Sequence, residues 1–188
     1  DLGVSTFVEN ICNAPISEDE YAYGLRKLKG AMHGAPSADS IMAWMILWAG
    51  TTLHSTLLAL LRLCWEWALL PECFRMAIVR YLKKQTSAVA MDISMHRALT
   101  LKSVLGKFFT RIMLLRLDII LSPHIPHSQV GYQQQLSSYT TVWAVRRLTR
   151  EIISSGSQVW VLLCDWAKAY DKVWRAMVLL IINAMGVT

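Results

Sequence analysis

The feature that most constrains the fold is residues 41–61, because this stretch contains no Lys, Arg, Asp or Glu. An apolar run of about 20 residues is long enough to cross the roughly 30 Å core of a bilayer. However, Gly50-Thr51-Thr52 and His54-Ser55-Thr56 place polar groups in its middle, where a membrane span is normally most apolar. We therefore expect two buried helices, at about residues 40–49 and 55–69, and no membrane; a transmembrane segment is the alternative.

The composition indicates a folded domain. Apolar residues make up 54% of the 188 residues and charged residues 17%, compared with about 45–50% and about 25% in typical domains. Burial of so many apolar side chains can offset the entropy lost on ordering, which excludes a disordered or fibrous chain. The four cysteines form no C-x-x-C pair and no signal peptide is visible. Both observations favour an intracellular, reducing compartment, nucleus or cytoplasm.

Positive charge is concentrated in one part of the chain. Residues 93–164 contain eight basic and two acidic residues, whereas residues 1–92 contain eight basic and nine acidic ones. A basic block beside a near-neutral one is typical of proteins that bind a polyanion such as nucleic acid, although a solvated helix face is the alternative. The candidate nucleic-acid-binding residues are Lys102, Lys107, Arg111, Arg116, Arg146 and Arg147.

The order of predicted elements indicates a helix-rich α+β fold. Ser17-Glu18-Asp19-Glu20 matches a capping box and predicts a helix that begins there. The run 159–164 (VWVLLC) is continuously apolar, which suits a strand buried on both faces. Two isolated strands cannot form a stable sheet, so we expect the sheet to be incomplete. The other expected elements are a strand at 76–82, a polar connection at 83–96, and helices at about 101–121, 138–154 and 174–185, the last closed by Gly186.

Asp165 is the first candidate for chemistry, because it directly follows the apolar run and precedes Asp171 by six residues. A carboxylate at a strand end is well placed to bind Mg²⁺, which takes oxygen ligands from the protein and from substrate phosphates. The alternative is that Asp165 only caps a following helix.

The segment VWVLLCDWAKAYDKV resembles the first palm motif of reverse transcriptases from non-LTR (LINE-type) retrotransposons, D-x-x-x-A-[FY]-D-x-[VI]. Other segments resemble the same family in the same order and extend the resemblance over about residues 16–188. They are ISEDEYAYGLRKLKG and GAPSADSI upstream, LPECFRMAIVRYLKK, RALTL at 97–101, and QVGY at 129–132 followed by Ser137.

The resemblance implies the fingers and partial palm of a right-hand polymerase, and it divides the chain into four segments. These are a lead-in segment at 1–15, a helical region at 16–69, a fingers-like region at 70–157, and a partial palm with the first catalytic motif at 158–188. The implied partners are an RNA template, a DNA primer, deoxynucleoside triphosphates and the remainder of the polymerase chain.

The resemblance also assigns roles to individual residues. Asp165 would be the catalytic residue that binds metal, with two Mg²⁺ ions in the intact enzyme, and Asp171 would be structural. The ring of Tyr170 would exclude a ribose 2′-OH, with simple packing as the alternative. The residues that would grip the triphosphate or line the template and nucleotide pocket are Lys83, Lys84, Arg97, Gln129, Gly131 and Tyr132.

The chain also departs from the family pattern. Ala98 stands where the family has a proline, and residues 133–136 (QQQL) stand where it has R-P-G-R. No second polymerase motif follows before Thr188, so we expect a fragment of an RNA-directed DNA polymerase that is inactive alone. A non-catalytic nucleic-acid-binding remnant of a retroelement is the alternative function.

Overall fold

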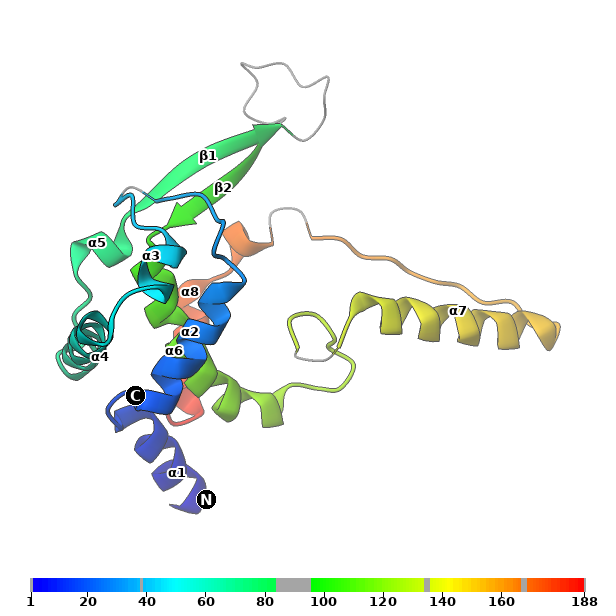
Figure 1. Cartoon of the computed structure of the whole chain (residues 1–188). Coiled ribbons are helices and arrows are strands. Elements are labelled where there is room, and N and C mark those ends of the chain that lie inside the picture. The colour runs from blue at the N-terminus through cyan, green and yellow to red at the C-terminus, as the bar shows by residue number, and fades with distance from the viewer. Residues whose placement is uncertain (1, 38, 84–95, 134–135, 167–168, 188) are drawn as a thin grey trace. The chain divides into compact units, whose positions relative to one another are not determined.

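The computed structural model of the chain (Figure 1) describes residues 2–37, 39–83, 96–133, 136–166 and 169–187. The chain divides into two compact units. The first unit is formed by residues 1–118 and the second by residues 119–188. This boundary lies within the predicted fingers-like region. Lys84, one of the predicted triphosphate-binding residues, lies outside the described residues.

The first unit begins with helices, of which the second starts where its sequence signal predicts, whereas the first lies in the segment 1–15, for which no helix was predicted. Ser17 caps the second helix: its Oγ accepts the Glu20 N–H at 3.1 Å, and Glu20 Oε2 accepts the Ser17 N–H at 2.8 Å. The capping box is therefore confirmed. The helices of this part are α1 (Leu2–Asn13), α2 (Glu18–Lys29), α3 (Ala43–Leu47), α4 (Thr51–Glu66) and α5 (Glu72–Arg75).

The uncharged stretch 41–61 forms two helices, as predicted. Helix α3 and the first part of α4 occupy it, with residues 48–50 between them. Ile46 of α3 and both Leu57 and Leu61 of α4 are buried. Among the described residues, no helix combines the length and the apolar character needed to cross a membrane.

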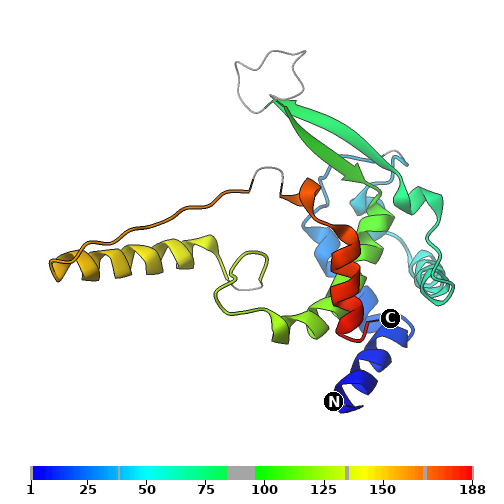
Figure 2. The same cartoon turned by 180° about the vertical axis from the view of Figure 1, so that it is seen from behind.

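A hairpin and a long helix complete the first unit. Strands β1 (Ala77–Lys83) and β2 (His96–Lys102) pair antiparallel, and α6 (Val104–Leu121) follows directly. The expected helix start at 101 is wrong, because 96–102 pairs with β1 instead and Ser103 ends the strand. Ser103 is buried, and its Oγ accepts the Gly106 N–H at 3.4 Å, which caps α6. Figure 2 shows the hairpin joined to the helices of this unit.

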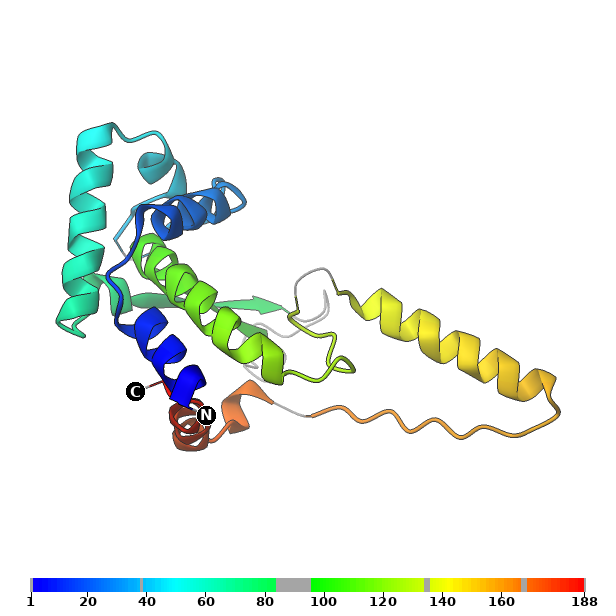
Figure 3. The same cartoon turned by 90° about the horizontal axis from the view of Figure 1, so that it is seen from below.

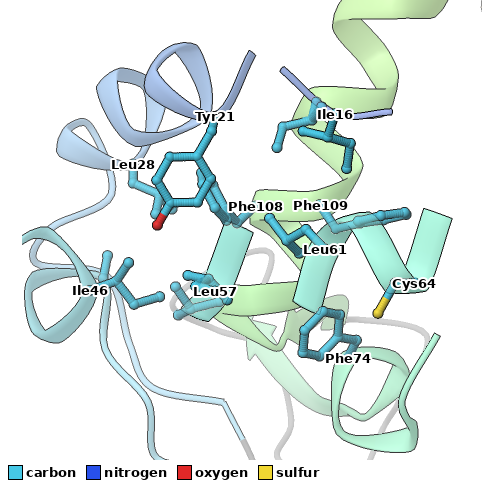
Figure 4. Packing of buried hydrophobic residues seen from close by; sticks show 13 residues of the cluster. Ile16, Tyr21, Leu28, Ile46, Leu57, Leu61, Cys64, Phe74, Phe108 and Phe109 are labelled. Atoms are coloured by element: carbon cyan, nitrogen blue, oxygen red, sulfur yellow. The ribbon is translucent and has the colours of Figure 1, made fainter. Parts of the chain in front are cut away.

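The core of the first unit lies between α2, α4 and α6, which Figure 3 shows from below. Phe108 and Ile112 of α6 are fully buried against Leu28 of α2 and Leu61 of α4 (Figure 4). Gly24 allows this close approach, because a Cβ there would lie 2.4 Å from the Phe108 ring. The unit therefore has a close-packed core of its own.

Tyr21 connects this core to α4. Its ring meets Phe108 edge-on, with centroids 5.1 Å apart, and its hydroxyl shares a 2.8 Å hydrogen bond with His54 Nδ1. Burial raises the pKa of Tyr21 to about 12. The aromatic pair and the satisfied hydroxyl together fix the packing of α2 against α4 and α6.

Arg116 is a buried structural residue, so its predicted role in nucleic-acid binding is wrong. Its side chain is 5% exposed, and the guanidinium donates to Glu20 Oε1 at 2.6 Å and to Glu20 Oε2 at 2.8 Å. It also donates to the carbonyls of Ala14 and Pro15 and lies 4.9 Å from the Trp65 ring centroid. With its donors occupied inside the unit, the side chain offers no surface to a polyanion.

The second unit consists of helices and extended segments with exposed side chains. Helix α7 (Ser138–Ser154) has the predicted bounds, and α8 (Arg175–Ala184) is one residue shorter at each end than expected. Gly186 follows α8 with φ +90°, which confirms the expected glycine stop. The short helices are η2 (Ser122–His124) and η3 (Tyr170–Lys172).

The predicted strand at 159–164 is not present. These residues form neither a strand nor a helix, and Trp160 and Leu163 are 91% and 90% exposed. A strand needs the backbone of a neighbour for its hydrogen bonds, and β1 and β2 form the one sheet found in the described ranges. The helix-rich α+β class is confirmed, with a two-stranded antiparallel sheet.

Candidate nucleotide and nucleic-acid site

Tyr132 and Tyr170 are two predicted pocket residues that the fold of the second unit brings together. Their hydroxyl groups hydrogen-bond to each other across 38 residues of sequence. Both rings remain exposed, Tyr132 at 93% and Tyr170 at 73%. The hydrogen bond to Tyr132 raises the pKa of Tyr170 above its usual value. Two neutral aromatic side chains are thus available for contact with a sugar or base.

The loop that carries Tyr132 is held by its own hydrogen bonds. The Gln129 N–H donates to the Pro126 carbonyl at 2.9 Å, and Gln129 Nε2 donates to the Gly131 carbonyl at 3.4 Å. Tyr132 itself adopts φ +64°, a left-handed conformation that is uncommon for a bulky residue. Gln129 and Gly131 therefore help to hold the loop conformation in which Tyr132 is exposed.

Asp165 is exposed in the extended segment that precedes η3, and Asp171 lies within η3. A pair of Mg²⁺ ions needs several carboxylate oxygens from the protein. The described ranges contain no group of three His, Cys, Asp or Glu side chains that could hold a metal ion. Asp165 can supply one carboxylate, so the described residues alone do not fit a two-metal site.

Lys83 and Arg97 lie at neighbouring positions near the end of the hairpin, and both are exposed. In the register, Arg97 is opposite Leu82 and Lys83 is opposite His96. Directly opposed residues share a face of the sheet and successive residues alternate. Lys83 and Arg97 therefore belong to opposite faces, and the hairpin does not present them as a single grip.

The basic candidates occupy three different environments. Lys102 is exposed on β2, and Lys107 and Arg111 are half-buried on α6. Arg146 and Arg147 are exposed on α7. These five residues remain candidates for anion binding, unlike Arg116.

Helix α7 adds two residues that the sequence analysis did not select. Trp143 and Arg150 line a hollow of about 370 Å³ together with Arg146, Arg147 and Glu151. The Arg147 guanidinium lies 5.5 Å from the Trp143 ring centroid, and its Nε lies 3.3 Å from Glu151 Oε1. The helical spacing of Trp143, Arg146, Arg147 and Arg150 is the signal that identifies this face.

The chain matches no protein-family model and no curated protein. Functional assignment therefore depends on its motifs and on the geometry described above.

Proposed function

We propose that this chain is part of an RNA-directed DNA polymerase of the reverse transcriptase type. It would contribute the fingers and the first palm motif of a right-hand polymerase that transfers deoxynucleotides to a DNA 3′-OH on an RNA template. The observation that carries this proposal is the ordered series of segments that ends in CDWAKAYD. The hydrogen bond between Tyr132 and Tyr170 supports it, since both residues match the nucleotide pocket of the family.

The exposed side chains support distinct roles in such an enzyme. Tyr170 would reject a ribonucleotide through contact between its ring and the 2′-OH, with Tyr132 fixing the ring from the opposite segment. Arg97 offers a planar fork for phosphate oxygens, and Lys83, on the opposite face of the hairpin, offers a compact charge at a separate position. Asp165 would provide one carboxylate toward Mg²⁺, which would neutralise charge at the phosphates in the complete polymerase.

The experiment that tests this proposal measures sugar selection in a polymerase that contains this chain together with the rest of the palm. Tyr170→Ala should raise incorporation of ribonucleotides relative to deoxynucleotides at least tenfold, because the ring that excludes the 2′-OH is lost. Tyr170→Phe is the matched control, since it keeps the ring and removes only the hydroxyl. An unchanged ratio in an active Tyr170→Ala enzyme contradicts the assignment.

A non-catalytic nucleic-acid-binding protein is the second candidate function. The observation that favours it is the exposed basic and aromatic face of α7. Such a protein would bind RNA with a strong dependence on salt. Under this alternative the chain would show no Mg²⁺-dependent binding of deoxynucleoside triphosphates, whereas the polymerase proposal requires that binding in the enzyme that contains it.

A further inference from the structure

A small pocket of about 180 Å³ lies in the first unit, between the loop at 31–35 and the first turns of α6. Leu28 and Leu101 contribute apolar walls, and Lys107 and Arg111 are the charged residues that line it. Liquid water occupies about 30 Å³ per molecule. The pocket therefore has room for a small ion with a few waters and is too small for a folded segment.

The pocket has an unbalanced positive charge. Lys107 and Arg111 are four residues apart on α6, so they share one face of the helix. No acidic residue lines the pocket, and neither cation forms an ion pair within the described ranges. Like charges at this spacing destabilise a helix, which an anion bound between them would relieve.

Arg111 also has a buried donor without an acceptor. Its Nη1 is inaccessible to solvent and makes no hydrogen bond to any described residue. Such groups are rare in native proteins, because an unpaired buried donor is destabilising. Arg116, little more than one turn further along α6, shows the opposite: both of its Nη atoms and its Nε have acceptors. The fold therefore provides acceptors for a structural arginine on this helix but none for the buried donor of Arg111.

We propose that this pocket binds a phosphate dianion, either inorganic phosphate or a terminal phosphate monoester, between Lys107 and Arg111. Two cations match the charge of about −1.5 to −2 that such a group carries near pH 7. A carboxylate or a phosphodiester, with one negative charge, would leave one of the cations uncompensated. Arg111 would supply a forked pair of donors and Lys107 a point charge.

The site is separate from the proposed polymerase residues and does not depend on them. Asp165, Tyr132 and Tyr170 belong to the second unit, whereas the pocket belongs entirely to the first. Among the described residues, Asp39 Oδ2 is the other buried side-chain atom without a hydrogen-bond partner, but Asp39 does not line the pocket. If Arg111 had a purely structural role instead, Asp39 would be its partner.

The test is a titration of the whole chain with inorganic phosphate, followed by backbone amide NMR and by thermal unfolding. Phosphate should shift the amide signals of residues 31–35 and 104–111 and should raise Tm. Arg111→Met and Lys107→Met should each weaken phosphate binding at least about tenfold, as expected when a hydrogen bond to a charged group is lost. Lys29→Met, an exposed cation at the end of α2, is the matched control and should bind phosphate like the parent chain.

The variants also separate ligand binding from a structural role. In phosphate-free buffer, Arg111→Met should keep or raise Tm, because it removes the unpaired donor and the like-charge pair. A loss of Tm in that buffer that Asp39→Asn reproduces would show that Arg111 acts structurally with Asp39, and would overturn the proposal. Lys107→Met keeps the test valid if Arg111→Met does not fold. Unchanged phosphate affinity in a folded Arg111→Met or Lys107→Met chain would also overturn it.

Two short RNAs of the same sequence, with a 5′-phosphate or a 5′-hydroxyl, distinguish the sources of the phosphate. If the natural ligand is a terminal monoester, only the phosphorylated RNA should displace inorganic phosphate from the amides of 31–35. If neither RNA displaces inorganic phosphate, the natural ligand of the pocket is free phosphate. Equal displacement by both would overturn the proposal, since it would show that the pocket does not select a dianion.

Discussion

The two units of the chain differ in what they do with apolar side chains. In the first unit, Phe108, Ile112 and Leu61 are fully buried between three helices. In the second unit, Trp160, Leu163 and most apolar residues of α8 are exposed, although 159–164 and α8 are among the most apolar parts of the sequence. Apolar composition is therefore not enough for a core, since a core also needs facing elements at the correct spacing.

The two units also differ in how they use charged side chains. The first unit buries Arg116 and pairs it with Glu20. The second unit keeps Arg146, Arg147 and Arg150 in solvent, where an ion pair such as Arg147–Glu151 contributes little to stability. We therefore expect mutations of the buried residues of the first unit to change folding, and mutations of the exposed residues of the second unit to change binding or catalysis.

Removal of a core side chain should give the largest effect on stability. Phe108→Ala should lower the free energy of unfolding by about 3–5 kcal/mol, because it deletes a buried ring from a packed site. Trp160→Ala should change it by less than about 0.5 kcal/mol, as expected for a surface substitution. Urea denaturation followed by far-UV circular dichroism measures both. Similar losses for the two variants would contradict the contrast between the units.

Loss of the buried ion pair should have the next largest effect. Arg116→Met should lower the free energy of unfolding by about 3 kcal/mol, because it leaves the Glu20 carboxylate and two backbone carbonyls without their partner. The matched change Arg147→Met breaks the exposed pair and should alter stability by less than about 1 kcal/mol. The same denaturation experiment measures both variants. A small change in the free energy of unfolding for Arg116→Met would show that the buried network is not needed for stability.

The Arg116–Glu20 pair should also make the free energy of unfolding depend on pH, with an effect smaller than that of Arg116→Met. Burial by itself would raise the pKa of Glu20, but hydrogen bonds from Arg116 and Ser17 outweigh it and hold the pKa below the usual glutamate value. Because the folded-state pKa is lowered, the stabilisation is fully present above the pKa of the unfolded chain. It is lost as the pH falls through the folded-state pKa.

Stability curves measured from pH 6 downward for the parent chain and for Glu20→Gln check this sign. The parent chain should lose stability more steeply below about pH 4.3, the usual glutamate pKa. Parallel curves for the two proteins would mean that Glu20 does not contribute to acid unfolding.

Local signals in the sequence predicted the helix ends well. Ser17 and Glu20 form the expected capping box, and α7 has the expected bounds. Both features depend on residues that are close in sequence. The hydroxyl and carboxylate that satisfy the first turn of α2 are only three residues apart, so the capping box can be identified from the local sequence alone.

Features that depend on distant residues could not be predicted in the same way. Strand β2 exists because 96–102 pairs with β1, and strand preference depends strongly on such context. The partner of Arg116 is Glu20, 96 residues away, so the basic block at 93–164 could not show that this residue is buried and paired. The apolar run 159–164 has the composition of a buried strand, but composition does not show whether neighbouring strands are present.

For the candidate site, the sequence could assign residues to a pocket but could not define their arrangement. Tyr132 and Tyr170 were both assigned to one pocket, and their hydroxyls do meet. Lys83 and Arg97 were assigned to one grip, but the register of the hairpin puts them on opposite faces. A register is fixed by the pairing of two strands, and a shift of one residue would reverse the result.

The most direct test of the polymerase proposal is primer extension by an enzyme that contains this chain with the remaining palm. Asp165→Asn should reduce extension to the level of a blank while the protein stays folded, because it removes one charge with little change in volume. Asp171→Asn, six residues away in η3, makes the same chemical change at a position assigned a structural role and should retain activity. Near-parental extension by the folded Asp165→Asn enzyme would contradict the assignment of Asp165 as the catalytic carboxylate.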